Sequence, residues 1–238
     1  MNGWNQFLWI IYPYIVITIF ITGHFYRLNH YPFSWTSKSS EFLEKRTLRW
    51  GSLLFHWGII FVIVGHVAGL LVPISVYQGL GISDEAYHMM ALSAGGIAGL
   101  STLIGAFILM VRRFRVKRVR ATSSVGDRVA IVLILIVLFT GLTATGTNAV
   151  GQTGFDYRTT INPWIRGILT FQPDASLMTA VPVAFKIHIL AALSLFAVWP
   201  FTRLVHVFSF PLTYLRRRYV IYRQRRPSCE RKSDKTVV

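Results

Sequence analysis

Cysteine is almost absent from this sequence. The single residue, Cys229, lies in a basic and polar stretch near the end of the chain. One thiol excludes an intrachain disulfide, an iron–sulfur cluster held by cysteines and a haem attached through a CxxCH motif. A metal or cofactor in this protein must therefore be held by other residue types.

Charge is also scarce, since charged residues make up 14% of the 238 residues and hydrophobic residues 53%. Typical soluble domains carry about 25% charged residues, and crossing a bilayer requires about 20 mainly apolar residues. Four stretches of the chain meet that length, and a fifth meets it if its helix begins around Pro182 with Lys186 near the headgroups. We therefore expect an all-α integral membrane protein, a five-transmembrane-helix bundle with spans near residues 4–26, 50–72, 87–111, 129–149 and 182–205.

The five spans are expected to form one domain, residues 1–222. No basic residue precedes the first span and no small-residue cleavage site follows it, so a removable signal peptide is not expected. Residues 223–238 are expected to be a disordered basic tail. The connection at 150–181 is long enough to hold a short helix.

Basic residues are unevenly distributed among the connections. Of the 25 Lys and Arg residues, five lie in residues 27–49, seven in 112–128 and ten in 203–238. The positive-inside rule therefore predicts a multi-pass protein of the cytoplasmic membrane, in contact with lipid, with its amino terminus outside and its carboxyl terminus in the cytoplasm. The net charge of +16 follows from this topology, and no fold motif indicates nucleic acid as a partner.

Four of the seven histidines lie in or at the ends of the second and fifth predicted spans. Ionisable side chains inside a membrane are costly and usually functional. The predicted orientation places His66 and His188 near the outer face, and His56 and His206 near the inner face. Two pairs of imidazoles at matching depths thus follow from the loop charges alone.

Each pair is sufficient for one haem iron, which takes an axial ligand from either side. One zinc ion cannot use all four rings, because His56 and His66 are about 15 Å apart along a helix. We expect His66 and His188 to hold the iron of an outer haem b, and His56 and His206 that of an inner one. On one continuous helix His188 and His206 would be about 27 Å apart. This separation fits poorly with the roughly 15 Å between their partners His66 and His56.

Glycines occur beside these histidines and in the third span. Three of them flank the histidines of the second span, where small side chains would leave room for a flat macrocycle: Gly58, Gly65 and Gly69. Four more lie in the third span, where close helix packing is the preferred interpretation: Gly95, Gly96, Gly99 and Gly105.

Two further sets of residues have the chemistry of cofactor or substrate contacts. Haem propionates are anionic, and Arg203, Arg112 and Arg113 at the inner face are candidates to bind them, although ordinary positive-inside arginines are the alternative interpretation. His88 opens the third span at the outer face. Its imidazole suits a hydrogen bond to a quinone carbonyl or the acceptance of a quinol proton.

The chain resembles the gamma subunit of membrane-bound respiratory nitrate reductase, a di-haem cytochrome b with five spans. The resemblance extends to about residue 222 and is specific because several short motifs occur together at these spacings. The motifs are IYPY at 11–14, LFHWGI at 54–59, GHVAG at 65–69, SAGG at 93–96, RVRAT at 118–122 and PFTRLVH at 200–206.

The resemblance implies the same four axial ligands in the same pairs. It further implies a quinol-oxidising subunit, with menaquinol or ubiquinol as substrate, that passes electrons through the two haems and releases protons outside. An iron–sulfur subunit and a molybdenum-containing subunit, where nitrate is reduced, are the implied partners. Family members often carry a lysine beside the quinol site between spans two and three. This chain has SDEAYHMM at 83–90 instead, which leaves Tyr87 and His88 as candidate quinol contacts.

Two rival interpretations stay open from the sequence. One is a related cytochrome b that serves another cytoplasmic reductase, of the sulfite or disulfide type. The other is a haem-free anchor or transporter whose histidines relay protons. The co-purified subunits would test the first, and a spectrum of b-type haem would test the second.

Overall fold

The computed structural model describes residues 3–31, 34–35, 40–150 and 155–208, and these residues form helices and connections without a strand. The basic tail expected at 223–238 lies outside the described residues. Five helices are long and apolar enough to cross a membrane, which confirms the all-α class and the number of spans. They are residues 3–30, α3 (Arg46–Leu71), α5 (Asp84–Arg115), α7 (Val125–Val150) and the span that begins with α9 (Val183–Val198).

The first span is built from three consecutive segments. These are α1 (Gly3–Gln6), the π-helical η1 (Phe7–Ile11) and α2 (Tyr12–His30). Short elements join the other spans: α4 (Ile74–Gly79), α6 (Lys117–Thr122), α8 (Tyr157–Leu169) and the 3-10 turns η3 (Ala175–Met178), η4 (Trp199–Phe201) and η5 (Arg203–Phe208).

Local sequence signals explain where the longest helix begins and ends. The Ser83 hydroxyl accepts a hydrogen bond from the Ala86 amide at 3.2 Å, and two acidic residues follow in the first turn of α5. Three arginines occupy its last turn. Acidic side chains at the amino-terminal end and basic side chains at the carboxyl-terminal end of a helix interact favourably with its dipole, and the Ser83 hydroxyl caps the first turn.

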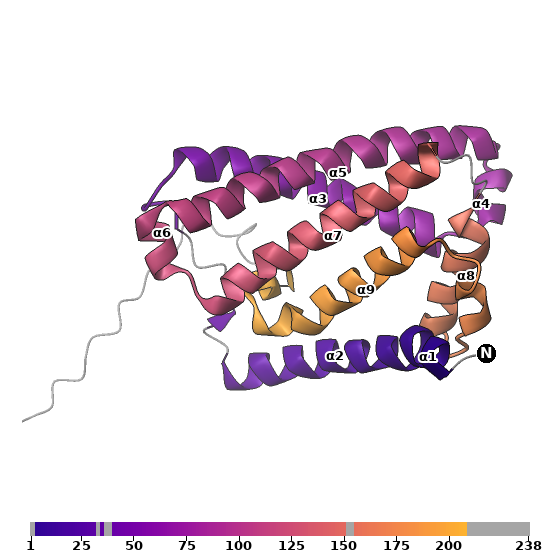
Figure 1. Ribbon diagram of the computed structural model, residues 1–238, viewed down its shortest axis with the longest axis horizontal. Helices are drawn as coiled ribbons and strands as arrows, with labels where there is room; N and C mark the ends of the chain where they lie inside the picture. The colour runs from indigo at the N-terminus through magenta and orange to yellow at the C-terminus, as the bar shows by residue number, and fades with distance from the viewer. Residues whose placement is uncertain (1–2, 32–33, 36–39, 151–154, 209–238) are drawn as a thin grey trace, which may run out of the picture.

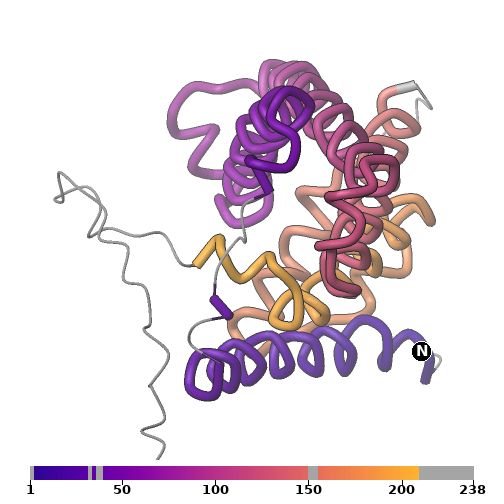
Figure 2. The backbone as a smooth tube through the Cα atoms, turned by 90° about the vertical axis from the view of Figure 1, so that its left-hand side faces the viewer, coloured from indigo at the N-terminus to yellow at the C-terminus, as the bar shows by residue number. Residues whose placement is uncertain are grey.

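The spans run along the long axis of the molecule (Figure 1). α3 packs along α5, α5 along α7, α7 along α9, and α9 against α2. Contacts between α3 and α9 are sparse among the described residues, although these two elements belong to the histidine-bearing spans. Figure 2 shows α9 and η5 lying between α2 on one side and the α3–α5 pair on the other.

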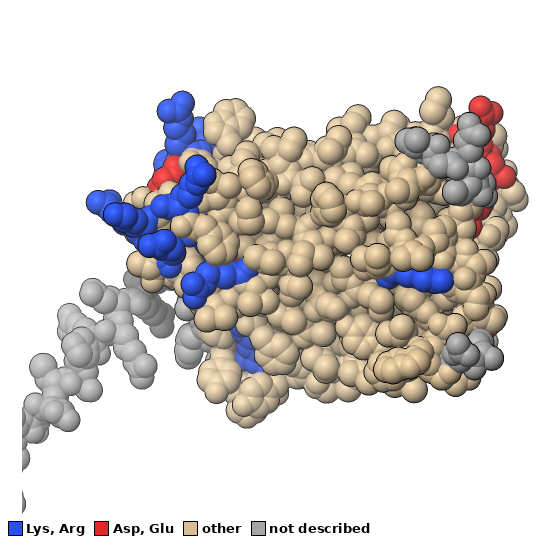
Figure 3. All heavy atoms as spheres, viewed as in Figure 1, with Lys and Arg blue, Asp and Glu red and all other residues tan. Residues whose placement is uncertain are grey.

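The charged residues gather at the two ends (Figure 3). We call the end with α6 the basic end, because the side chains of Arg115, Lys117, Arg118 and Arg120 are exposed there. We call the opposite end, where α4, α8 and η3 lie, the α8 end. The broad surface between them is apolar, and large side chains such as Phe61, Ile97 and Phe139 are exposed on it, as expected for lipid contact.

The short helix anticipated in the connection at 150–181 is α8, which lies across the α8 end (Figure 1). Its apolar residues recur every three or four positions, so Ile161, Trp164 and Ile168 share one buried face. This face packs against Trp9 of the first span, whose carbonyl accepts a hydrogen bond from the Trp164 indole at 2.8 Å. α8 is therefore fixed to the bundle.

The fifth span differs from the continuous helix expected over 182–205. Its α-helix ends at Val198, and η4 and η5 continue the chain to Phe208. Pro200 has no amide hydrogen to extend the helix, and Thr202 is extended, with φ −114° and ψ −177°. The continuous helical rise that gave about 27 Å between His188 and His206 therefore does not apply beyond Val198.

Candidate functional site

The structure brings the four predicted histidines together in the two predicted pairs. The ring centres of His66 and His188, which we call the upper pair, are 6.2 Å apart toward the α8 end. Those of His56 and His206, which we call the lower pair, are 6.4 Å apart toward the basic end. Each pair joins the second span to the fifth, so the bundle contains two similar sites in series.

All four imidazoles carry their hydrogen on the same nitrogen. Each Nδ1 lies within hydrogen-bond distance of a backbone carbonyl oxygen, and a carbonyl can only accept. The bonded nitrogen is therefore Nδ1–H, and the unprotonated Nε2 carries the lone pair with which an imidazole binds a metal. The distances from Nδ1 to oxygen are 2.7 Å for His56 to Ser52, 2.8 Å for His66 to Val62, 3.1 Å for His188 to Val137 and 2.7 Å for His206 to Arg203.

The spacing of each pair fits one metal ion between two rings. Metal–imidazole nitrogen bonds of about 2.0 Å place two opposing ring centres about 6 Å apart, close to both observed separations. Three His, Cys, Asp or Glu side chains do not meet at one centre among the described residues. The donor sets therefore suit a metal that brings its own equatorial ligands, as haem iron does.

Gly141 of α7 is a contributor that the sequence did not reveal. A Cβ atom at this position would lie 2.8 Å from Cε1 of His188, so only glycine lets the imidazole lie directly against α7. Val137, one turn earlier on α7, provides the carbonyl that receives the Nδ1 hydrogen. One turn of α7 therefore both accommodates and orients His188.

Arg27 is a second contributor that sequence reasoning missed. Its Nη1 donates to the carbonyl oxygens of Pro200 at 2.7 Å and Thr202 at 2.6 Å. These carbonyls lie at the break after α9, where η4 leads into η5. Gly23, one turn before Arg27, lets the Pro200 ring approach α2, because a Cβ there would lie 2.8 Å from Pro200 Cβ. α2 thus holds the turn that leads to His206.

The three arginines predicted to meet propionates all lie at the basic end, and each has protein partners. The buried Asp127 carboxylate accepts from Arg203 Nε at 2.7 Å and pairs with Arg113 Nη1 at 3.1 Å. Arg112 is buried and donates to Glu44 Oε2 at 2.7 Å and to the carbonyl of Ser40. Arg112 therefore ties the connection before α3 to α5, and propionate binding by the three stays a prediction.

The two predicted quinol contacts lie at the α8 end, within a network around Arg158. This guanidinium is 5% exposed and pairs with Asp84 at 2.9 Å and with Asp156 at 2.8 Å. Its Nη2 also donates to Nε2 of His88 at 3.1 Å, and its charge lies 4.9 Å from the ring centre of Tyr87. Nε2 of His88 is therefore the acceptor in this contact.

Tyr87 is buried and lies close to the histidine-bearing helix α3. Its hydroxyl accepts a hydrogen bond from the Tyr157 hydroxyl at 3.2 Å. A Cβ at Gly69 would lie 3.2 Å from the same Tyr87 oxygen, and Gly69 is three residues after His66. The Tyr87 hydroxyl thus lies within about one helical turn of the upper histidine pair.

Burial and pairing shift the titration of the α8 groups. Burial raises the pKa of Tyr157, and its bond to Tyr87 adds to the effect. Burial alone would also raise the pKa of Asp156, but hydrogen bonds from Arg158 outweigh it and lower that pKa below its ordinary value. Tyr157 therefore stays a hydrogen-bond donor, and Asp156 stays charged, at neutral pH.

We expect Asp156→Asn to loosen α8, because the buried Arg158 then loses one of its two carboxylates, at a cost of about 2 kcal/mol. A carboxyl with a lowered pKa stabilises the fold above its unfolded pKa of about 3.9 and loses that contribution as the pH falls through the folded value. Limited proteolysis at α8 should therefore show protection in the wild type that is lost below about pH 4.

In Asp156→Asn the same protection should be weaker at neutral pH and change less with acid. Glu85→Gln is the matched control, because Glu85 is an exposed acid at the same end without a described contact to Arg158. Equal proteolysis of the wild type and Asp156→Asn at pH 7 would contradict the anchoring role.

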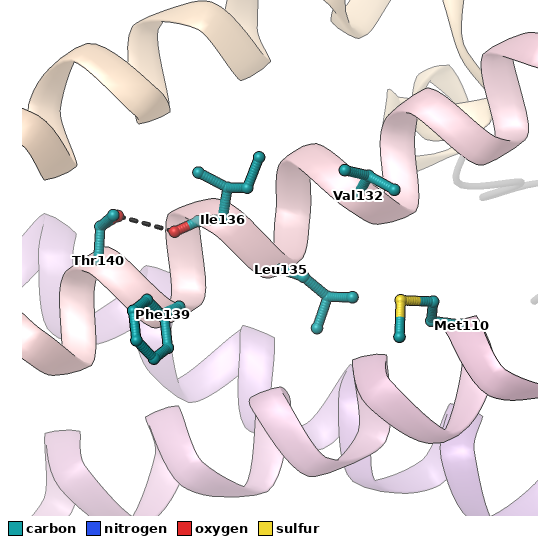
Figure 4. A pocket seen from close by; sticks show the side chains of 6 residues that line it. All are labelled: Met110, Val132, Leu135, Ile136, Phe139 and Thr140. Atoms are coloured by element: carbon teal, nitrogen blue, oxygen red, sulfur yellow. Dashed lines mark hydrogen bonds between the residues drawn. The ribbon is translucent and has the colours of Figure 1, made fainter.

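A surface hollow of about 300 Å³ lies between α5 and α7, and the Thr140 hydroxyl in its lining is 3.4 Å from Nδ1 of His188. Figure 4 shows its lining side chains, which include the exposed Val132, Ile136 and Phe139. Its one hydroxyl, on Thr140, donates to the Ile136 carbonyl at 2.8 Å. The hollow suits an acyl chain, and it lacks the polar groups that a quinol head group would need.

Comparison with known proteins identifies relatives over almost the whole chain. The model of a family described as nitrate reductase gamma subunit matches residues 5–225. The nitrate reductase gamma chain of Bacillus subtilis is 54% identical over 225 residues, which cover 94% of this chain and 100% of that protein. The respiratory nitrate reductase 2 gamma chain of Escherichia coli is 37% identical over 223 residues, covering 93% and 98%. The nitrate reductase-like protein NarX of Mycobacterium tuberculosis is 42% identical over 223 residues, which are 93% of this chain and 34% of that protein.

Proposed function

The chain belongs to the nitrate reductase gamma subunit family, and from this premise we propose that it is the di-haem, quinol-oxidising subunit of its complex. It is a membrane subunit of a multi-subunit nitrate reductase, and it is not itself the site of nitrate reduction in this proposal. The observation that carries the proposal is the pair of histidine sites, each spaced for one iron with its Nδ1 atoms already bonded.

In this proposal His66 and His188 hold one haem b, and His56 and His206 hold the other. The two haems supply one-electron transfer across the bundle. The carbonyls that accept from each Nδ1 fix the ring orientation and increase the basicity of Nε2, which strengthens its bond to iron. In the fifth span, Gly141 lets the His188 ring lie against α7, and Arg27 holds the turn at Pro200 that leads to His206.

Quinol oxidation belongs at the α8 end, beside His66. Tyr87 and His88 are the proposed quinol contacts, with the Tyr87 hydroxyl close to α3 and the His88 ring held by Arg158. Because Nε2 of His88 is occupied, the ring offers Nδ1–H as a donor to a quinol oxygen. The exposed carboxylate of Asp84, 2.9 Å from Arg158, is the proposed acceptor from which a proton would leave to water.

The proposed orientation places the basic end in the cytoplasm and the α8 end outside, as the positive-inside rule predicts. Protons released at the α8 end then leave on the outer side. The cytoplasmic basic end would meet an iron–sulfur subunit, which in turn serves a molybdenum-containing subunit. The exposed cations of α6 support docking of an acidic surface there.

A spectrum of membranes that contain the full chain tests this function. We expect a reduced-minus-oxidised difference spectrum of b-type haem, with two haems per chain, and reduction of both by an added menaquinol or ubiquinol analogue. Capture of the chain should also recover an iron–sulfur and a molybdenum subunit. Absence of b-type bands would leave a haem-free transporter or anchor as the explanation.

A further inference from the structure

Some buried polar atoms have no hydrogen-bond partner within the described part of the chain. They are His24 Nε2, Thr160 Oγ1, Asn162 Oδ1 and Trp199 Nε1. A buried polar atom without a partner costs about 1–3 kcal/mol, so a ligand that supplies the partner is a physical reason for it. His24 and Trp199 are of interest because they lie near the break that leads to His206.

These two side chains border the same group of aromatic rings. The His24 ring is 4.4 Å from Phe20 and 5.1 Å from Phe208, centre to centre. The Trp199 ring is 6.1 Å from Phe20 and 6.2 Å from Phe208. Phe208 is two residues after His206, so both unpartnered nitrogens lie beside the segment that carries the lower histidine ligand.

Both nitrogens are suited to an anionic acceptor. The Nδ1 atom of His24 lies 2.6 Å from the Phe20 carbonyl oxygen and therefore carries a hydrogen. Nε2 donates only when it carries a hydrogen as well. The indole nitrogen of Trp199 is a donor only. Both rings border Phe20 and Phe208, and a carboxylate that reached both nitrogens would be a common acceptor for them.

The arginines at the same end are less available to such an anion. Arg112 is engaged by Glu44 and the Ser40 carbonyl, while Arg113 and Arg203 share Asp127. The haem that His56 and His206 are proposed to hold carries two propionate carboxylates, which need donors in a site that excludes water.

We propose that His24 and Trp199 donate hydrogen bonds to a propionate of the haem held by His56 and His206. The inference rests on the proposed function and adds two residues of this chain to that site. Donors beside a propionate offset its negative charge and so favour the reduced, less positively charged iron. Removing them should lower the midpoint potential of this haem and leave the other haem unchanged.

The experiment is a redox titration of both haems in membranes that contain the full complex. His24→Phe keeps an aromatic ring and removes the nitrogens, and His24→Gln is the matched variant that restores an N–H donor. Trp199→Phe keeps the stacking with Phe196 and removes the indole N–H. His206→Ala identifies which haem belongs to the lower pair, because that haem should be missing from its spectrum.

We expect His24→Phe and Trp199→Phe each to lower the potential of the haem missing from His206→Ala, with His24→Gln closer to the wild type. Loss of that haem in His24→Phe and its retention in His24→Gln would also support the inference. Equal potentials in all variants, or an equal shift of both haems, would overturn it. A wild type without haem would instead refute the proposed function.

Discussion

Replacing His66 by alanine is expected to remove one of two b-type haems and to leave the other in place. His66 and His188 form one pair, with ring centres 6.2 Å apart, and alanine leaves a single axial ligand there. The second pair is built from different side chains, so its spectrum should persist. Reduction by a quinol analogue should fall by about 100-fold or more, because even groups that only orient metal ligands cost about 10- to 100-fold when they are replaced.

The measurement is the haem content per chain, with the rate of haem reduction by quinol followed in the same membranes. His30→Ala is the matched control, since His30 is exposed at the end of α2 and its Nδ1 bonds only its own helix, at the Tyr26 carbonyl. Two haems retained in His66→Ala would reject the pairing, and two haems lost in His30→Ala would show that histidine replacement harms the fold in general.

The number of spans and the pairing of the histidines were predictable because both depend on patterns local to the chain. Apolar length set the spans, and the charge of the connections set the direction of each. Direction alone then matched His66 with His188 and His56 with His206. The ring separations in the structure agree with this pairing, while its use for haem iron stays a proposal.

The helix break and its anchor were not predictable in the same way. The sequence predicted a continuous span over 182–205, whereas the α-helix ends at Val198, before Pro200, and the carbonyls of Pro200 and Thr202 are bound by Arg27, which is 173 residues earlier in the chain than Pro200. In the sequence Arg27 is one of many positive-inside arginines. Arg112 and Arg203 raise the same difficulty, because their carboxylate partners come from other helices and connections.

The glycines separate into two kinds that the sequence does not distinguish. Gly58 was expected to leave room for a macrocycle, yet it lies against α5, where a Cβ would be 2.8 Å from the Thr102 amide. A Cβ at Gly65 would meet nothing within 4 Å, so Gly65 fits the expected room for a macrocycle better than Gly58 does. Spacing alone could not separate them, because seven residues amount to almost two turns and place both near one face of α3.

The last prediction uses two glycines of the same helix, α5. A Cβ at Gly105 would overlap the backbone amide of Phe55 and lie 2.8 Å from Phe55 Cα, so Gly105→Ala must push α3 away at the residue before His56. Backbone cannot yield as a flexible side chain does, and we expect a loss of about 1–3 kcal/mol or more. Displacement of His56 should weaken the lower pair first.

Gly95→Ala is the matched control, because a Cβ at Gly95 meets nothing within 4 Å and the same substitution there adds only helix propensity, worth up to about 1 kcal/mol. Thermal stability in detergent and the content of each haem measure both variants. We expect Gly105→Ala to unfold at a lower temperature and to lose mainly the haem of His56 and His206, while Gly95→Ala equals or exceeds the wild type. If both variants behave alike, α3 is not seated against α5 at Gly105, and the position of His56 must depend on other contacts.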